Sequence, residues 1–134
     1  MTDAVAACAA EIVALHRVFE ATLGAPGADD GGRYEAAFAP GFQMVMPSGK
    51  RLDRAAVLDF LRGARGVRGL GFRIAIEDAE PLHVAPPLVL MHYIERQWVA
   101  GAETARRAVA LFDVAGDTPL WLFVQETWIS PPPA

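Results

Sequence analysis

The chain has 134 residues, of which 53% are hydrophobic, and it carries a formal net charge of −4 at pH 7. No apolar run approaches the roughly 18 residues that a membrane-spanning helix needs. The twelve basic residues are scattered along the chain, whereas a nucleic-acid-binding protein gathers them into a stripe. The composition therefore argues against a membrane protein and a nucleic-acid binder. It predicts one domain, residues 1–134, whose surplus of apolar residues goes to a large core, a lined cavity or a partner subunit.

The cysteine and histidine content argues against disulfides and metal sites. Cys8 is the only cysteine, so no disulfide can form within the chain, and we expect a reducing, cytoplasmic environment. The start of the sequence, MTDAVAACAAE, is acidic and alanine-rich, which is typical of a helix rather than a signal peptide. His16, His83 and His92 have none of the spacings of metal ligands, so we expect no metal and no cofactor.

The first half of the sequence predicts mainly helices. From Thr2 to Leu23, apolar residues recur at three- and four-residue steps, which is the spacing of one helical face. The turn-rich stretch GAPGADDGG (24–32) ends this helix, and a short helix follows at about 33–38. FQMVM (42–46) predicts a strand and PSGK a turn. LDRAAVLDFLRGA then predicts another helix, with Asp53 as its N-cap.

After this point the apolar period changes from 3.6 to 2, which predicts strands. The predicted strands are GFRIAIED (71–78), LVLMHYIERQWV (88–99), RRAVALFDV (106–114) and LWLFVQETWI (120–129). Residues 129–134 are expected to form a tail, because the prolines of PPPA lack the N–H that a ladder needs. Helices followed by antiparallel strands are typical of an α+β domain with helices on one side of a sheet.

The last predicted strands begin with apolar residues on both faces. In a regular strand, one face of the final strand would hold Trp121, Phe123, Gln125 and Thr127, and the other Leu122, Val124, Glu126 and Trp128. About three helices can cover only one face of the sheet. We therefore expect the other face, including Val109 and Trp128, to meet a second copy of the chain in a homodimer.

The stretch FAPGFQMVMPSGKRLDRAAVLDFL, with a strand-rich half that closes on LWLFVQETWI, resembles the nuclear transport factor 2-like superfamily. It looks closest to the SnoaL-like members and their relatives of unknown function, and the resemblance spans Leu15 to Ile129. It implies a cystatin-like fold, in which a strongly curved mixed sheet wraps around about three helices into a cone. It also implies a deep apolar pocket and, commonly, a dimer packed through the sheet.

Relatives in this superfamily include ketosteroid isomerase, scytalone dehydratase and polyketide cyclases, alongside members without catalysis. The enzymes are similar to one another in placing an Asp or His base inside the cone. In this chain, Asp78 lies at a strand end and Asp113 precedes a turn, so neither matches such a base. The final strand has Gln125 where close relatives often have His.

Glu126 is the most informative polar residue, because an unpaired carboxylate on a buried strand face is costly. It could form a structural ion pair with Arg96, Arg106 or Arg107 on a neighbouring strand, act as a general base in the pocket, or be exposed. His16, beside the apolar face of the first helix, could be a base or a boundary residue. Tyr93 could donate to a substrate carbonyl or be a core residue.

The candidate catalytic residues are therefore His16, Tyr93 and Glu126. The side chains expected to line the pocket are Met44, Met46, Phe112, Trp121, Phe123, Gln125 and Thr127. Three arginines, Arg62, Arg65 and Arg68, recur every three residues in a glycine-rich stretch; they could hold an anionic ligand, but a solvated face is the simpler interpretation.

These features predict a protein that binds a small apolar or aromatic molecule. Two functions remain open at this point: a cofactor-independent isomerase, dehydratase or cyclase, or a non-catalytic ligand-binding or accessory dimerisation protein. The sequence pattern does not decide between them, because this fold hosts both. Catalysis requires at least two titratable side chains that converge at one spot inside the cone.

Overall fold

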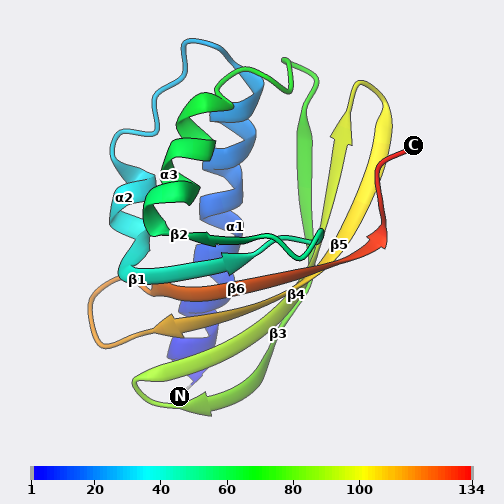
Figure 1. Ribbon diagram of the computed structural model, residues 1–134. Helices are drawn as coiled ribbons and strands as arrows, with labels where there is room; N and C mark the ends of the chain where they lie inside the picture. The colour runs from blue at the N-terminus through cyan, green and yellow to red at the C-terminus, as the bar shows by residue number, and fades with distance from the viewer. Residues whose placement is uncertain (1, 134) are drawn as a thin grey trace.

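The computed structural model describes residues 2–133, which form a curved sheet folded around three helices (Figure 1). The helices are α1 (Thr2–Gly24), α2 (Arg33–Ala37) and α3 (Arg54–Gly63). The strands are β1 (Phe38–Val45), β2 (Arg51–Asp53), β3 (Arg73–Ala85), β4 (Leu88–Val99), β5 (Ala102–Asp113) and β6 (Leu120–Ser130). Their order in the sheet is β2-β1-β6-β5-β4-β3. The pair β1–β6 is parallel and the other pairs are antiparallel, so the predicted mixed α+β sheet is confirmed.

The helices begin, end and bury the faces that the sequence indicates. In α1, Cys8, Ile12 and Leu15 are buried at helical spacing, and the helix packs across β3 and β4. The helix α3 begins after Asp53, whose carboxylate accepts a hydrogen bond from the backbone N–H of Ala56 at 2.9 Å. This is the predicted N-cap. No helix within residues 2–133 combines the length and the apolar character needed to cross a membrane.

Several strands differ from their predicted bounds. The strands β1 and β5 begin at Phe38 and Ala102, each four residues before its predicted start. The three-residue strand β2 was not predicted, because a strand this short has no visible period. The strand β3 continues to Ala85, well beyond the predicted 71–78. Its register shifts between Glu77 and Glu80 and again between Pro81 and His83. Such irregularities break the two-residue alternation by which a strand is recognised in a sequence.

A bulge in β6 changes which of its side chains face the helices. Leu111 of β5 pairs with Phe123, whereas Phe112 pairs with Trp121, so Leu122 is an extra residue between them. Before the bulge, Trp121 faces the helices and is 2% exposed. Beyond it, the inward positions belong to Val124, Glu126 and Trp128, and the outward positions to Phe123, Gln125 and Thr127. The predicted grouping of Trp121 with Phe123, Gln125 and Thr127 on one face is therefore wrong.

The loop between α3 and β3 is tied to the end of α1. The backbone N–H groups of Gly66 and Arg68 donate to the carbonyl oxygens of Thr22 and Leu23, each at 2.9 Å. Gly66 has a φ of +70°, and a Cβ added to it would lie 2.5 Å from the Cα of Pro26. Only glycine meets both conditions, so Gly66 allows the loop to bring Arg68 against the sheet.

We expect Gly66→Ala to destabilise the protein more than Gly101→Ala. Both glycines have a positive φ, but a Cβ at Gly101 would meet nothing within 4 Å. Conformational strain alone should lower the free energy of unfolding of Gly101→Ala by about 1–2 kcal/mol. The overlap with Pro26 should cost Gly66→Ala about 1–3 kcal/mol more. Urea unfolding of both variants measures the difference, and equal losses would show that Pro26 yields easily.

Candidate functional site

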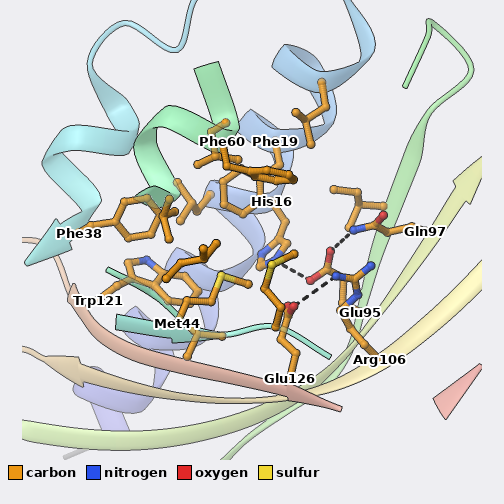
Figure 2. A pocket seen from close by; sticks show the side chains of 18 of the residues that line it. His16, Phe19, Phe38, Met44, Phe60, Glu95, Gln97, Arg106, Trp121 and Glu126 are labelled. Atoms are coloured by element: carbon orange, nitrogen blue, oxygen red, sulfur yellow. Dashed lines mark hydrogen bonds and ion pairs between the residues drawn. The ribbon is translucent and has the colours of Figure 1, made fainter. Parts of the chain in front are cut away.

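A cavity of about 120 Å³ lies between the helices and the inner face of the sheet. Its apolar walls come from α1, β1, β6 and the turn after β1, and they include Phe19, Phe38, Phe42, Met44, Met46 and Trp121. Figure 2 labels Phe19, Phe38, Met44 and Trp121 among them. Phe60 of α3 also lines the cavity and is 47% exposed, so the cavity reaches the protein surface beside this side chain. The interior thus has a hollow whose edge lies at the surface beside Phe60.

Polar side chains gather at one end of the cavity, opposite Phe38 and Trp121 (Figure 2). They come from α1, the α3–β3 loop, β4, β5 and β6. This polar cluster consists of His16, Arg68, Tyr93, Glu95, Gln97, Arg106 and Glu126. Five of the seven are charged or can titrate near neutral pH, and they are separated along the chain by up to 110 positions. Only the tertiary fold brings them together.

The pair His16–Glu95 links α1 to β4. His16 Nε2 lies 3.0 Å from Glu95 Oε1, and His16 Nδ1 lies 2.6 Å from the carbonyl oxygen of Ile12. Both ring nitrogens therefore face acceptors, which is the arrangement of a protonated imidazolium. Gln97 donates to the second oxygen of Glu95 at 2.6 Å.

The charges of this pair shift both pKa values towards the ionised forms. Burial acts to lower the pKa of His16, but the charge and hydrogen bond of Glu95 raise it above its ordinary value. Burial likewise acts to raise the pKa of Glu95, but His16, Arg106 and Gln97 lower it to about 2. At neutral pH we therefore treat His16 and Glu95 as a buried ion pair.

Glu126 lies in a different electrostatic environment. Arg106 donates from its NH1 group to Glu126 Oε1 at 3.2 Å, and the Arg106 guanidinium lies over the Trp128 ring at 4.7 Å. Burial and the negative charge of Glu95 raise the pKa of Glu126 to about 7, although Arg106 and His16 act in the opposite direction. Glu126 therefore exchanges its proton near neutral pH.

Tyr93 and Arg68 complete the polar cluster. Burial, followed by the charges of Glu95 and Glu126, raises the pKa of Tyr93 well above its ordinary value, so its hydroxyl stays protonated. Arg68 NH1 lies 3.5 Å from Gln97 Oε1, and its guanidinium lies over the Phe72 ring. Burial and the charge of Arg106 lower the pKa of Arg68. The cluster thus holds a neutral hydroxyl donor and a second guanidinium.

Trp121, at the apolar end, is held in place by a buried carboxylate. The indole Nε1–H of Trp121 donates to Glu11 Oε2 at 2.9 Å, and Arg33 NH2 contacts Glu11 Oε1 at 2.5 Å. The ring also packs against Phe112, with 4.5 Å between ring centroids. These contacts fix one wall of the cavity.

No family model and no curated protein matches the sequence. Among solved structures, a nuclear transport factor 2-like protein of unknown function from Pseudomonas aeruginosa is 28% identical, with a TM-score of 0.84. The match covers 92% of this chain and 99% of that chain. The chain therefore has the fold of the nuclear transport factor 2-like superfamily.

Two more distant structures share the fold of this nuclear transport factor 2-like chain. One is a domain of unknown function with a cystatin-like fold from Nostoc punctiforme, 17% identical, with a TM-score of 0.64 over 88% of this chain and 75% of that chain. The other, from Parabacteroides distasonis, is provisionally named a ketosteroid isomerase. It is 9% identical, with a TM-score of 0.64 over 90% of this chain and 86% of that chain. At these identities the likeness shows the fold alone.

Within the nuclear transport factor 2-like cone, several residues singled out from the sequence come together. The three candidate catalytic residues and three of the predicted wall residues line the same cavity: His16, Tyr93, Glu126, Met44, Met46 and Trp121. Of the partners considered for Glu126, Arg106 is the one observed.

Four predicted wall residues lie elsewhere. Phe112 is fully buried behind Trp121. Phe123, Gln125 and Thr127 are on the outer face of β6, because the bulge at Leu122 reverses the alternation. Gln125 and Thr127 are exposed there. They are therefore not placed to orient a ligand in the cone.

Sequence reasoning missed Glu95 and Gln97, although a signal was present. In LVLMHYIERQWV, Tyr93, Glu95 and Gln97 are two residues apart and so share one face of the strand. The structure shows that this face points towards the helices. The signal for Arg68 was weaker, because it is one of three arginines spaced three residues apart. Arg62 and Arg65 are exposed, as a solvated face predicts, whereas Arg68 lines the cavity.

We expect Glu126→Gln to weaken the pH dependence of stability. Because the pKa of Glu126 is raised from 4.5 to about 7 in the folded state, the folded protein binds more protons than the unfolded chain in that window. The free energy of unfolding should therefore fall as pH rises from about 4.5 to 7. Glu126→Gln should show a shallower fall.

The matched control for this measurement is Glu103→Gln, which removes an exposed carboxylate on β5. It should keep the wild-type slope in chemical unfolding across the same pH range. Glu95 does not contribute in this window, because its lowered pKa makes the protein lose stability only as pH falls below 4.5. A Glu126→Gln slope identical to that of Glu103→Gln would mean that Glu126 is ionised throughout.

Proposed function

We propose that the cavity is the active site of a cofactor-independent enzyme that transfers a proton within a small apolar or aromatic molecule, as in isomerisation, dehydration or cyclisation. The observation that carries the proposal is the position of Glu126, a buried carboxyl group that lines an apolar cavity and whose pKa is raised to about 7 by burial and the charge of Glu95. General bases are most effective when their pKa lies near the working pH. The ketosteroid isomerase name of one structural neighbour adds support at the level of the fold.

The proposed reaction needs only residues of this chain. Ionised Glu126 removes a proton from a carbon next to a substrate carbonyl. The electron pair of the broken C–H bond forms a carbon–carbon double bond, and the π electrons of the carbonyl move to its oxygen. The Tyr93 hydroxyl and the Arg106 guanidinium, both in the cavity wall, stabilise the negative charge on that oxygen. Protonated Glu126 then returns the proton to another carbon of the same molecule.

His16 has a supporting part in this scheme. Its two ring nitrogens are occupied by Ile12 and Glu95, so no lone pair is free to take a proton from a substrate. The imidazolium instead balances the charge of Glu95. We therefore assign the base to Glu126 and a positioning role to His16.

The size of the cavity bounds the substrate. Its volume is about 120 Å³, and an engineered apolar protein cavity of about 150 Å³ binds benzene. Typical sites for larger ligands measure about 300–1,000 Å³. The substrate that fits is therefore a single ring, much smaller than a steroid.

A non-catalytic ligand-binding function is the second candidate. It is favoured by the mutual hydrogen bonds of His16, Glu95 and Gln97, which satisfy one another without a ligand. In that case the polar cluster would only orient a ligand. A buried ion-pair network has this structural use in many proteins.

Deuterium exchange separates these two functions. We expect the protein to speed the exchange of acidic C–H groups in a panel of monocyclic ketones dissolved in D₂O, followed by NMR. Because Glu126 carries the proton, Glu126→Gln should slow exchange about 10²–10⁴-fold, whereas the exposed-site control Glu103→Gln should keep the wild-type rate. Panel members that raise the melting temperature but do not exchange would favour the binding function.

We also propose that the chain forms a homodimer through the outer face of its sheet. Half-buried apolar side chains of β4, β5 and β6 form this outer face: Leu90, Ile94, Val109, Leu111 and Phe123. The helices cover the opposite face, so a second copy would bury this one. Trp128, which the sequence placed here, instead lies beside Arg106 on the inner side. A lone buried cysteine, Cys8, accords with the cytoplasmic location that we propose with it.

The dimer is tested by a charge in the centre of the outer face. Val109→Asp should shift the sedimentation coefficient from that of a dimer to that of a monomer, because an unpaired carboxylate in an apolar interface is costly. Val67→Asp, in an exposed loop where the native side chain is 70% exposed, should leave the dimer intact. A Val109→Asp protein that sediments as the wild type does would place the interface elsewhere.

A further inference from the structure

The polar cluster contains more positive than negative groups. Its cations are Arg68, Arg106 and His16, and its carboxyl groups are Glu95 and Glu126. When Glu126 is protonated, only Glu95 remains to balance three cations. Burying unbalanced charge is unfavourable, and a bound anion would relieve it.

Arg106 has donor capacity that the protein does not use. Its NH1 group donates to Glu126, but its Nε atom is buried and has no hydrogen-bond acceptor within residues 2–133. A guanidinium is planar and presents paired N–H groups that match the two oxygens of a carboxylate. The Nε–H of Arg106 therefore lacks an acceptor, which one oxygen of a ligand carboxylate could supply.

Arg68 is similarly underused. Its contact with Gln97 Oε1, at 3.5 Å, is at the long limit of a hydrogen bond. The loop hydrogen bonds to Leu23 and Thr22 hold it in the cavity wall close enough to Arg106 for the charge of Arg106 to lower its pKa. Glu95 interacts with both arginines, but it already pairs with His16 and Gln97. Two guanidinium groups held near each other can bind the oxygens of an anionic ligand.

We propose that the ligand of this cavity is a monocyclic carboxylate, whose carboxylate group binds Arg68 and Arg106 and whose ring lies against Phe38, Phe42 and Trp121. The proposal rests on the proposed small-molecule site and narrows its substrate class. The rings of Phe38 and Phe42 stack at 4.4 Å, and Trp121 is fixed by Glu11, so the apolar end presents flat surfaces to a ring. Figure 2 shows Phe38 and Trp121 across the cavity from Arg106.

This geometry couples ligand binding to the proton of Glu126. A ligand carboxylate at Arg106 competes with Glu126 for the same guanidinium and adds a negative charge beside it. The other charged or titratable groups around Glu126 are Glu95 and Tyr93 from β4 and His16 from α1. With Glu95 already negative, Glu126 is the group that takes up a proton when the ligand binds. Affinity should therefore fall as pH rises through about 7. A carboxylate substrate would therefore meet Glu126 as an acid, which first gives its proton to one carbon and then, once ionised, removes a proton from another carbon of the same molecule.

Benzoate and benzamide, which have the same ring and nearly the same size, test the proposal by isothermal titration calorimetry. Wild-type protein should bind benzoate about tenfold more tightly than neutral benzamide or better, as expected for hydrogen bonds to a charged group. In buffers with different heats of ionisation, benzoate binding should take up protons at pH 7, and this uptake should vanish in Glu126→Gln. Benzamide binding as tight as benzoate binding, or no binding of either probe, would overturn the proposal.

Arg68→Gln should weaken benzoate binding about tenfold and leave benzamide binding unchanged. Arg65→Gln is the matched control, because Arg65 belongs to the same loop but pairs with Asp29 and Asp30 outside the cavity. Equal effects of the two substitutions would overturn the proposal. The benzoate-to-benzamide ratio of the wild-type protein needs no variant, so it decides the matter even if Arg68→Gln folds poorly.

The outcomes also separate this inference from the proposed catalysis. Selective benzoate binding without deuterium exchange in any ketone would support the carboxylate site and rule out the proposed catalysis. Deuterium exchange that depends on Glu126, combined with equal binding of benzoate and benzamide, would support the proposed catalysis and rule out the carboxylate site.

Discussion

Charge buried inside an apolar cone is the constraint on which this structure depends. A carboxylate or guanidinium in such an interior is stable only when it is paired and hydrogen-bonded. His16 of α1 therefore has to meet Glu95 of β4, and Arg106 of β5 has to meet Glu126 of β6. The first contact fixes how α1 lies across the sheet, and the second lies between adjacent strands. Together they set the polar end of the cavity.

The two carboxyl groups of the cavity have different properties because their neighbours differ. Glu95 has an imidazolium and an amide donor in contact, so its pKa falls to about 2. Glu126 shares one arginine and lies in the field of Glu95, so its pKa rises to about 7. The permanent charge of Glu95 is thus part of the reason that Glu126 can exchange a proton near neutral pH. Pairs of groups whose environments separate their pKa values are a recurring arrangement in acid–base sites.

Local sequence patterns predicted the elements better than they predicted the site. The helical spacing of α1, the cap at Asp53 and the alternation of β4 are local, and each was visible in the sequence. The bulge at Leu122 is a property of the pairing between β5 and β6, and one extra residue was enough to send Gln125 outward. The position of Arg68 depends on hydrogen bonds to the end of α1, which no local pattern reveals.

The stability cost of the buried Glu126 carboxyl group distinguishes a binding protein from an enzyme in this fold. A cavity that only binds an apolar ring needs no second carboxyl group, and an apolar side chain of similar volume is often equally stable or more stable at such a position. Glu126 is 6% exposed, beside Glu95, in a place where ionisation is unfavourable. Because its pKa is raised, Glu126 lowers the stability of the folded protein at neutral pH and above. An apolar residue at this position would avoid that cost, but it could not transfer a proton to a ligand.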